Sequence, residues 1–136
     1  MGIYDILYSG LAANKQWMEA TTNNIANINT TRTAEGGPYK RQSVVMEAKG
    51  SFDEFFNQKI GGGVEVTKVV QDDSVRVTYD PDHPDADAEG NVLMPAINLA
   101  AEMTDLIMAQ RAYEANVTTL NSAKEANEKT LEIGKV

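Results

Sequence analysis

Apolar and small side chains recur at alternating steps of four and three residues through the last third of the chain. No proline interrupts this stripe, and Gly134 lies where a helix would end. The pattern predicts one long amphipathic helix that needs a partner helix, because its apolar side would otherwise lie in water. The members of the stripe are Leu99, Met103, Leu106, Gln110, Tyr113, Val117, Leu120, Lys124, Asn127 and Leu131.

The same spacing reappears near the start of the chain, which offers the partner. Its members are Tyr4, Leu7, Leu11, Asn14, Met18, Thr21, Ile25 and Ile28. We expect this second helix to fray near Asn29, where Asn and Thr residues collect. The two helices should form a coiled-coil-like pair, in which the polar members of each stripe restrict the register. The only tryptophan, Trp17, fits equally a core position and an anchor between subunits.

Between the helices the pattern changes to that of strands. Tyr39 to Glu47 is expected to be extended. Val64 to Val69 and Val75 to Tyr79 alternate with period two, and Gln71 to Ser74 resembles a turn, so the sequence predicts a β-hairpin made of these two strands. The last helix should begin after Pro95, with Asn98 as its N-cap.

The predicted fold class is therefore α+β, with long terminal helices that enclose a small β-rich insert. We assign residues 1–30 to the N-terminal heptad helix and residues 95–136 to the C-terminal one. Residues 31–94 hold an extended loop, the β-hairpin and an acidic, proline-rich loop.

Charge and composition exclude several classes of function. The net charge is −8 and the isoelectric point is about 4.6, which argues against binding to nucleic acid or to an anionic membrane surface. There is no cysteine for a disulfide or a thiolate metal site. The first residues lack the basic start and apolar run of a cleavable secretion signal, and no apolar segment is long enough to insert into a bilayer.

The acidic loop is the one stretch where metal chemistry could occur. Asp85 to Val92 matches the first half of a calcium-binding EF-hand loop, but Ala96 stands where the bidentate glutamate would be. His83 is the only histidine and has no cysteine nucleophile or second histidine to work with. We therefore expect no catalytic residue, cofactor or metal. A calcium-binding switch in residues 80–92 and a self-contained secreted interaction module stay as alternatives.

Several motifs resemble the bacterial flagellar rod and hook axial family. Asn24 to Thr31 is similar to the Ala-Asn-x-x-Thr signature that ends the first helix of that family, and its motif residues here are Asn24, Ala26, Asn27 and Thr30. Thr31 to Arg41, the acidic loop from Tyr79 to Val92, Met103 to Asp105, and Arg111 to Val117 with Asn121 resemble the proximal-rod members. Gly10 to Lys15 departs from the family pattern, which leaves the contacts of the first helix open.

The resemblance implies a structural subunit of the proximal rod, the hollow drive shaft that transmits torque and carries the export channel. Its implied partners are its own copies, other rod proteins, the membrane-ring adaptor and the flagellar type III export apparatus, which would deliver it to the periplasmic basal body without a cleavable signal. Folding would be coupled to assembly, so the free subunit should have mobile ends.

Two groups of residues are expected to contact neighbours in such an assembly. The helix positions expected to pack within and between subunits are Leu7, Leu11, Met18, Ile25, Ile28, Leu99, Met103, Leu106, Tyr113, Val117, Leu120 and Leu131. The loop positions expected to contact adjacent subunits are Tyr79, Asp80, Pro81, His83, Pro84, Asp85 and Asp87.

Overall fold

Two long antiparallel helices and two small antiparallel sheets make up the fold. The structure is a computed structural model that describes residues 2–50 and 62–134, so residues 51–61 of the predicted insert lie outside it. The elements are α1 (Ile3–Ala26), β1 (Arg41–Ala48), β2 (Val64–Asp72), β3 (Val75–Tyr79), β4 (Asn91–Pro95) and α3 (Leu99–Ile133).

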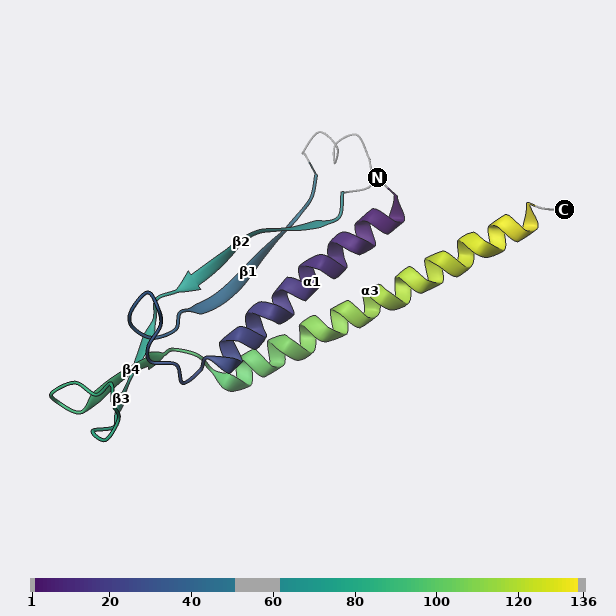
Figure 1. Ribbon diagram of the computed structural model, residues 1–136. Helices are drawn as coiled ribbons and strands as arrows, with labels where there is room; N and C mark the ends of the chain where they lie inside the picture. Colours follow the sequence, from purple (N-terminus) through teal and green to yellow (C-terminus); the bar gives the residue numbers. More distant parts are fainter. Residues whose placement is uncertain (1, 51–61, 135–136) are drawn as a thin grey trace.

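Helix α1 occupies the middle of the molecule (Figure 1). It packs against α3 on one side and against β1 and β2 on the other. The β3–β4 sheet lies beyond the end of the helical pair at which α1 ends and α3 begins (Figure 1). At the opposite end, α3 extends past the start of α1.

Both predicted helices are confirmed, and so is the predicted cap of the second one. The Asn98 side-chain oxygen accepts hydrogen bonds from the backbone N–H groups of Ala100 (3.0 Å) and Ala101 (3.3 Å), two donors that have no partner inside the helix. Gly134 follows the last residue of α3, as predicted. Its backbone is right-handed (φ −76°), so this helix end does not use the ability of glycine to adopt positive φ.

The predicted pairing of the strands is wrong. Strand β2 pairs with β1, from Arg41 opposite Asp72 to Ala48 opposite Val64, whereas β3 pairs with β4, from Val75 opposite Pro95. The Asp72 side chain accepts a hydrogen bond from Ser74 N (2.9 Å), in a local turn that separates the two sheets instead of folding β2 onto β3.

Strand β4 was absent from the predicted strands. Its five residues end in proline and follow the acidic loop, and these two features hid a strand of only three apolar residues, Val92 to Met94. The acidic loop consequently connects β3 to β4. It is the tip of a hairpin, and β4 separates it from α3.

Small side chains bring the two helices together. Among the described residues, the buried apolar side chains are Ala13, Ala20, Val92, Ile97, Ala109 and Leu120. At Gly10 an added Cβ would lie 3.0 Å from the Nδ2 atom of Asn116 on α3, so the helices come close at this point. The helices thus lie side by side as predicted, with a glycine at the close approach to Asn116 and with one large member of the C-terminal stripe, Leu120, buried.

In the described part of the chain, no helix is both long and apolar enough to span a bilayer.

Candidate assembly surfaces

A buried asparagine links three elements of the fold. Asn24 lies on α1 with 1% of its surface exposed. Its Nδ2 group donates to the Gln42 carbonyl on β1 (2.8 Å) and to Glu102 Oε2 on α3 (2.9 Å). Its Oδ1 atom accepts from the Gln42 N–H (2.8 Å) and from the Tyr39 hydroxyl (3.1 Å). All of its hydrogen-bonding capacity is therefore used inside the protein.

Glu102 completes this buried polar cluster from α3. It is 1% exposed, and its Oε1 atom accepts from Arg41 Nε at 2.6 Å, while the Arg41 guanidinium also approaches Asp105 (3.8 Å). Burial, and then the negative charge of Glu102, raise the pKa of the Tyr39 hydroxyl, which keeps it a hydrogen-bond donor. Because Glu102 must meet both Asn24 and Arg41, the cluster restricts how α1, β1 and α3 align.

The other family-motif residues turn the chain after α1. Ala26 is the last residue of α1, and the Asn27 side chain donates to the Asn23 carbonyl (2.9 Å). The Thr30 hydroxyl donates to Asn27 Oδ1 (3.1 Å), and its N–H donates to the Asn27 carbonyl (3.0 Å). Asn27 and Thr30 thus close the turn that follows α1, whereas Asn24 joins the buried cluster.

The acidic loop is held by its own chain. Asp85 accepts a hydrogen bond from the Thr31 hydroxyl (2.7 Å) and forms an ion pair with Arg32, and these contacts lower the pKa of its carboxyl group. His83 Nδ1 accepts from the Asp85 N–H (3.0 Å), which is a local structural role. Asp85 therefore fixes the hairpin tip to the segment that follows α1.

Calcium binding by this loop finds no support. Asp87 Oδ1 accepts hydrogen bonds from the backbone N–H groups of Asn91 (2.8 Å) and Glu89 (2.9 Å). The bond from Asn91 is the main cause of the lowered pKa of the Asp87 carboxyl group. Within residues 2–50 and 62–134, no three His, Asp or Glu side chains gather in a way that could hold a metal ion. The carboxylates are used to shape the loop.

The expected helix contacts differ widely in burial within one chain. Leu120 is buried, whereas Leu99, Met103 and Leu131 are exposed. The remaining expected helix positions are half-buried: Leu7, Leu11, Met18, Ile25, Ile28, Leu106, Tyr113 and Val117. Of the expected loop contacts, Asp80, His83 and Asp85 are half-buried, and Tyr79, Pro81, Pro84 and Asp87 are exposed.

Other exposed apolar side chains were missing from the expected contacts. Two, Ile107 and Met108, lie on α3 beside Met103. The others are Ile3 and Tyr8 on α1, Val69 and Val70 on β2, Val75 and Val77 on β3, Leu93 on β4, and Ile133 at the end of α3. The strand residues could have been found from their period-two alternation, which places Val75, Val77 and Tyr79 on one side of β3.

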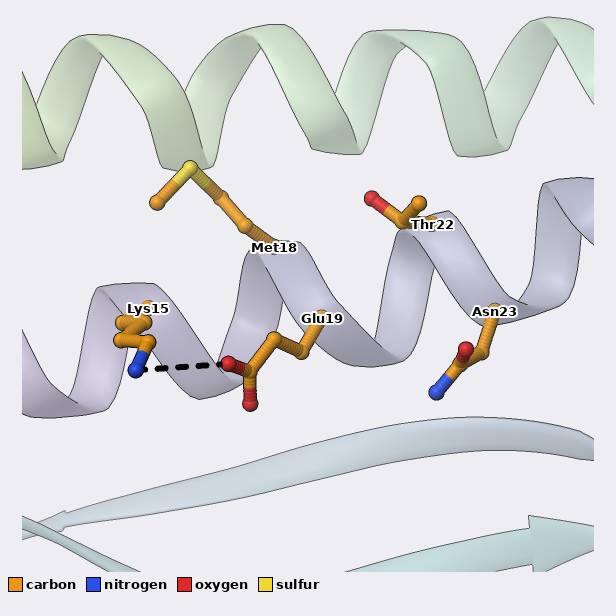
Figure 2. Close-up of a pocket in the computed structure, with 5 residues that line it drawn as sticks. All are labelled: Lys15, Met18, Glu19, Thr22 and Asn23. Atoms are coloured by element: carbon orange, nitrogen blue, oxygen red, sulfur yellow. Dashed lines mark ion pairs between the residues drawn. The ribbon is translucent and has the colours of Figure 1, made fainter.

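A shallow groove of about 420 Å³ runs along α1 (Figure 2). Met18 and Thr22 point toward α3, whereas Lys15, Glu19 and Asn23 lie on the side of α1 nearer the strands. Lys15 and Glu19 form an exposed ion pair at 3.6 Å, which contributes little to stability. These lining residues all belong to α1.

Comparison with known proteins identifies the family. Residues 5–32 match the family described as flagella basal body rod protein, and residues 88–133 match the family described as flagellar basal body rod FlgEFG protein C-terminal. The chain is 42% identical over 139 residues to the flagellar basal-body rod protein FlgC of Bacillus subtilis, covering 93% of each chain. The chain belongs to the FlgC family of flagellar basal-body rod proteins.

Other FlgC proteins are similar over nearly the same span. Identity is 40% to the protein of Borreliella burgdorferi, covering 91% of this chain and 92% of that one. Identity is 33% to the protein of Salmonella typhimurium, covering 98% and 97%. The family is structural and not enzymatic, which agrees with the expectation of a structural rod subunit.

Proposed function

We propose that this chain is a structural subunit of the flagellar basal-body rod and that it assembles with its own copies and with other rod proteins. The observation that carries the proposal is the set of large apolar side chains that α3 leaves exposed. Leu99, Met103 and Ile107 follow one another at four-residue steps and are each about half exposed, so they form a stripe on α3. Exposed apolar stripes of this kind are typical of interfaces with other chains.

The packing of α1 on α3 explains why this stripe is available. Gly10 lets the helices come close, and of the large stripe members on α3, Leu120 is buried whereas Leu99, Met103 and Leu131 stay exposed. In a rod, neighbouring subunits would cover them and would complete the coiled-coil-like packing that one chain leaves unfinished. A shaft of such subunits would transmit torque and enclose the export channel.

Export by the flagellar type III apparatus to the periplasmic rod, and contact with the membrane-ring adaptor, belong to the same proposal. They rest on the family resemblance and on the modest core. A chain with few large buried side chains among its described residues costs little free energy to unfold for export.

The test compares two adjacent substitutions on α3 in cells that lack the native gene. Met103→Asp places a charge in the exposed stripe, and we expect the variant to keep its helical circular dichroism yet to be absent from isolated basal bodies, leaving cells without hooks. Thr104→Asp is the matched control, since Thr104 is also exposed and lies one residue along the same turn. Normal swimming of the Met103→Asp cells would contradict the proposed interface.

A further inference from the structure

The end of the molecule that carries the β3–β4 sheet has an apolar groove of about 580 Å³. Its lining includes Ile28, which follows α1, Val75 and Arg76 on β3, and Leu99 at the start of α3. Deletion of one leucine side chain leaves a cavity of about 150 Å³ in a protein core. The groove therefore has room for two large apolar side chains from another molecule.

The opposite end of the molecule carries two such side chains. The Tyr4 hydroxyl donates to the Ala123 carbonyl (3.2 Å) and accepts from the side chain of Asn127, and these are contacts near the start of α1. Past them, α3 continues for another turn and more, with Leu131 at 68% and Ile133 at 77% exposed. An apolar helix end thus lies far from the apolar groove of the same chain, since α3 has 35 residues and a length of about 50 Å.

The electrostatics of the two ends are complementary. The last turn of α3 holds no basic residue, although Lys129 precedes that turn and Lys135 follows it in the sequence, and within the turn both the end of the helix dipole and Glu132 are negative. The groove holds Arg76, which forms no ion pair with any carboxylate in the described ranges and donates only to the Met94 sulfur (3.7 Å). Asn98 and the first turn of α3, at the positive end of the dipole, border the same groove.

We propose that this groove receives the C-terminal end of an α3-type helix from the next rod subunit. The inference rests on the proposed function and adds the partner segment: an amphipathic helix end with apolar residues in its last turn and no basic side chain there. Leu131 and Ile133 show the type of residue that enters the groove, and Arg76 faces the negative helix end. Because donor and acceptor surfaces lie at opposite ends, the contact is heterologous and repeats without closing.

The test uses the full-length chain in assembled basal bodies. The photoreactive residue benzoylphenylalanine is placed at Val75, or at Ala96, which is exposed and also lines the groove, in case the first position prevents incorporation. After irradiation, mass spectrometry identifies the linked peptide. We expect the linked peptide to come from the last two turns of the C-terminal helix of a rod subunit. When that subunit is a second copy of this chain, the linked peptide lies within residues 127–134.

Controls separate this contact from the proposed function itself. The same photoreactive residue at Thr67, exposed on β2, should give no link to a helix end. Arg76→Glu should reduce the yield from position 75 severalfold, and Arg76→Lys should retain it. If the chain is present in basal bodies but links to another segment or to nothing, the groove proposal is wrong while rod function stands; if the chain is absent from wild-type basal bodies, the proposed function is wrong.

Discussion

Removing the Asn24 side chain should destabilise the isolated chain far more than removing that of its neighbour. Asn24→Ala deletes four hydrogen bonds, which join α1 to Gln42, Tyr39 and Glu102. Each bond contributes about 1 kcal/mol net, and Glu102 is left buried with one bond fewer. Alanine recovers about 0.5 kcal/mol through its higher helix propensity. We therefore expect the free energy of unfolding to fall by about 3 kcal/mol.

The measurement is urea unfolding followed by circular dichroism at the helix band. With a slope of about 1 to 3 kcal/mol per molar urea, the midpoint should fall by about 1 to 3 M. Asn23→Ala is the matched control, because Asn23 is exposed on the same helix and its side chain forms no hydrogen bond with the described residues. A loss below about 1 kcal/mol for Asn24→Ala, or equal losses for both variants, would refute the idea that the buried cluster holds the three elements together.

Three further predictions concern other contacts of the fold. Gly10→Leu should lower the free energy of unfolding by about 1 to 3 kcal/mol in the same urea assay, because the new side chain would push against Asn116. Gly90→Ala should cost about 1 to 3 kcal/mol, since φ is +80° and the added Cβ would lie 2.9 Å from a ring carbon of Tyr79. The pKa of Asp85 is lowered in the folded state, so the ionised carboxylate should stabilise the fold above the ordinary aspartate pKa of about 3.9. This stabilisation should be lost as the pH falls through the lower pKa of the folded state. Carboxyl NMR shifts measure the titration.

Each of these predictions has its own control. Ala12→Leu, exposed on the same helix as Gly10, should change stability by less than about 0.5 kcal/mol. Gly36→Ala, at φ +88° with nothing within 4 Å of an added Cβ, should show the backbone cost alone and so a smaller loss than Gly90→Ala. Arg32→Ala should raise the Asp85 pKa toward its ordinary value, and an unchanged titration would show that the ion pair is not formed in solution.

The helices could be predicted from the sequence because their signals are local. Two long heptad stretches, one N-cap and a terminal glycine are enough to define α1 and α3, and no tertiary contact overrides them. The exchange of strand partners was not predictable in the same way. Nothing in Val64 to Val69 or Val75 to Tyr79 says which strand lies opposite, and β4 was hidden by a flanking proline.

The buried polar cluster shows a second limit of prediction. Glu102 lies in the first turn of α3, where a glutamate is normally solvated and interacts with the helix dipole, so nothing in the local sequence predicts its burial. Its partners Asn24 and Arg41 are 78 and 61 residues away in sequence, so their meeting depends on the whole fold.

The packing of α1 also revises the expectation of mobile ends. Because α1 is packed on two sides, we expect rapid hydrogen exchange in the part of α3 past Asn127 rather than throughout α1.

The short connection between β4 and α3 determines how the chain responds to load. Pro95 and Ile97 are buried, the Ala96 N–H donates to the Ser74 carbonyl (3.3 Å), and α3 begins at Leu99. The connection has only a few residues, and the burial of Pro95 and Ile97 and the hydrogen bond of Ala96 limit how far the β3–β4 sheet can rotate about the start of α3. Because this sheet shares no strand pairing with β1 and β2, a sideways force on it would reach the rest of the chain mainly through the start of α3.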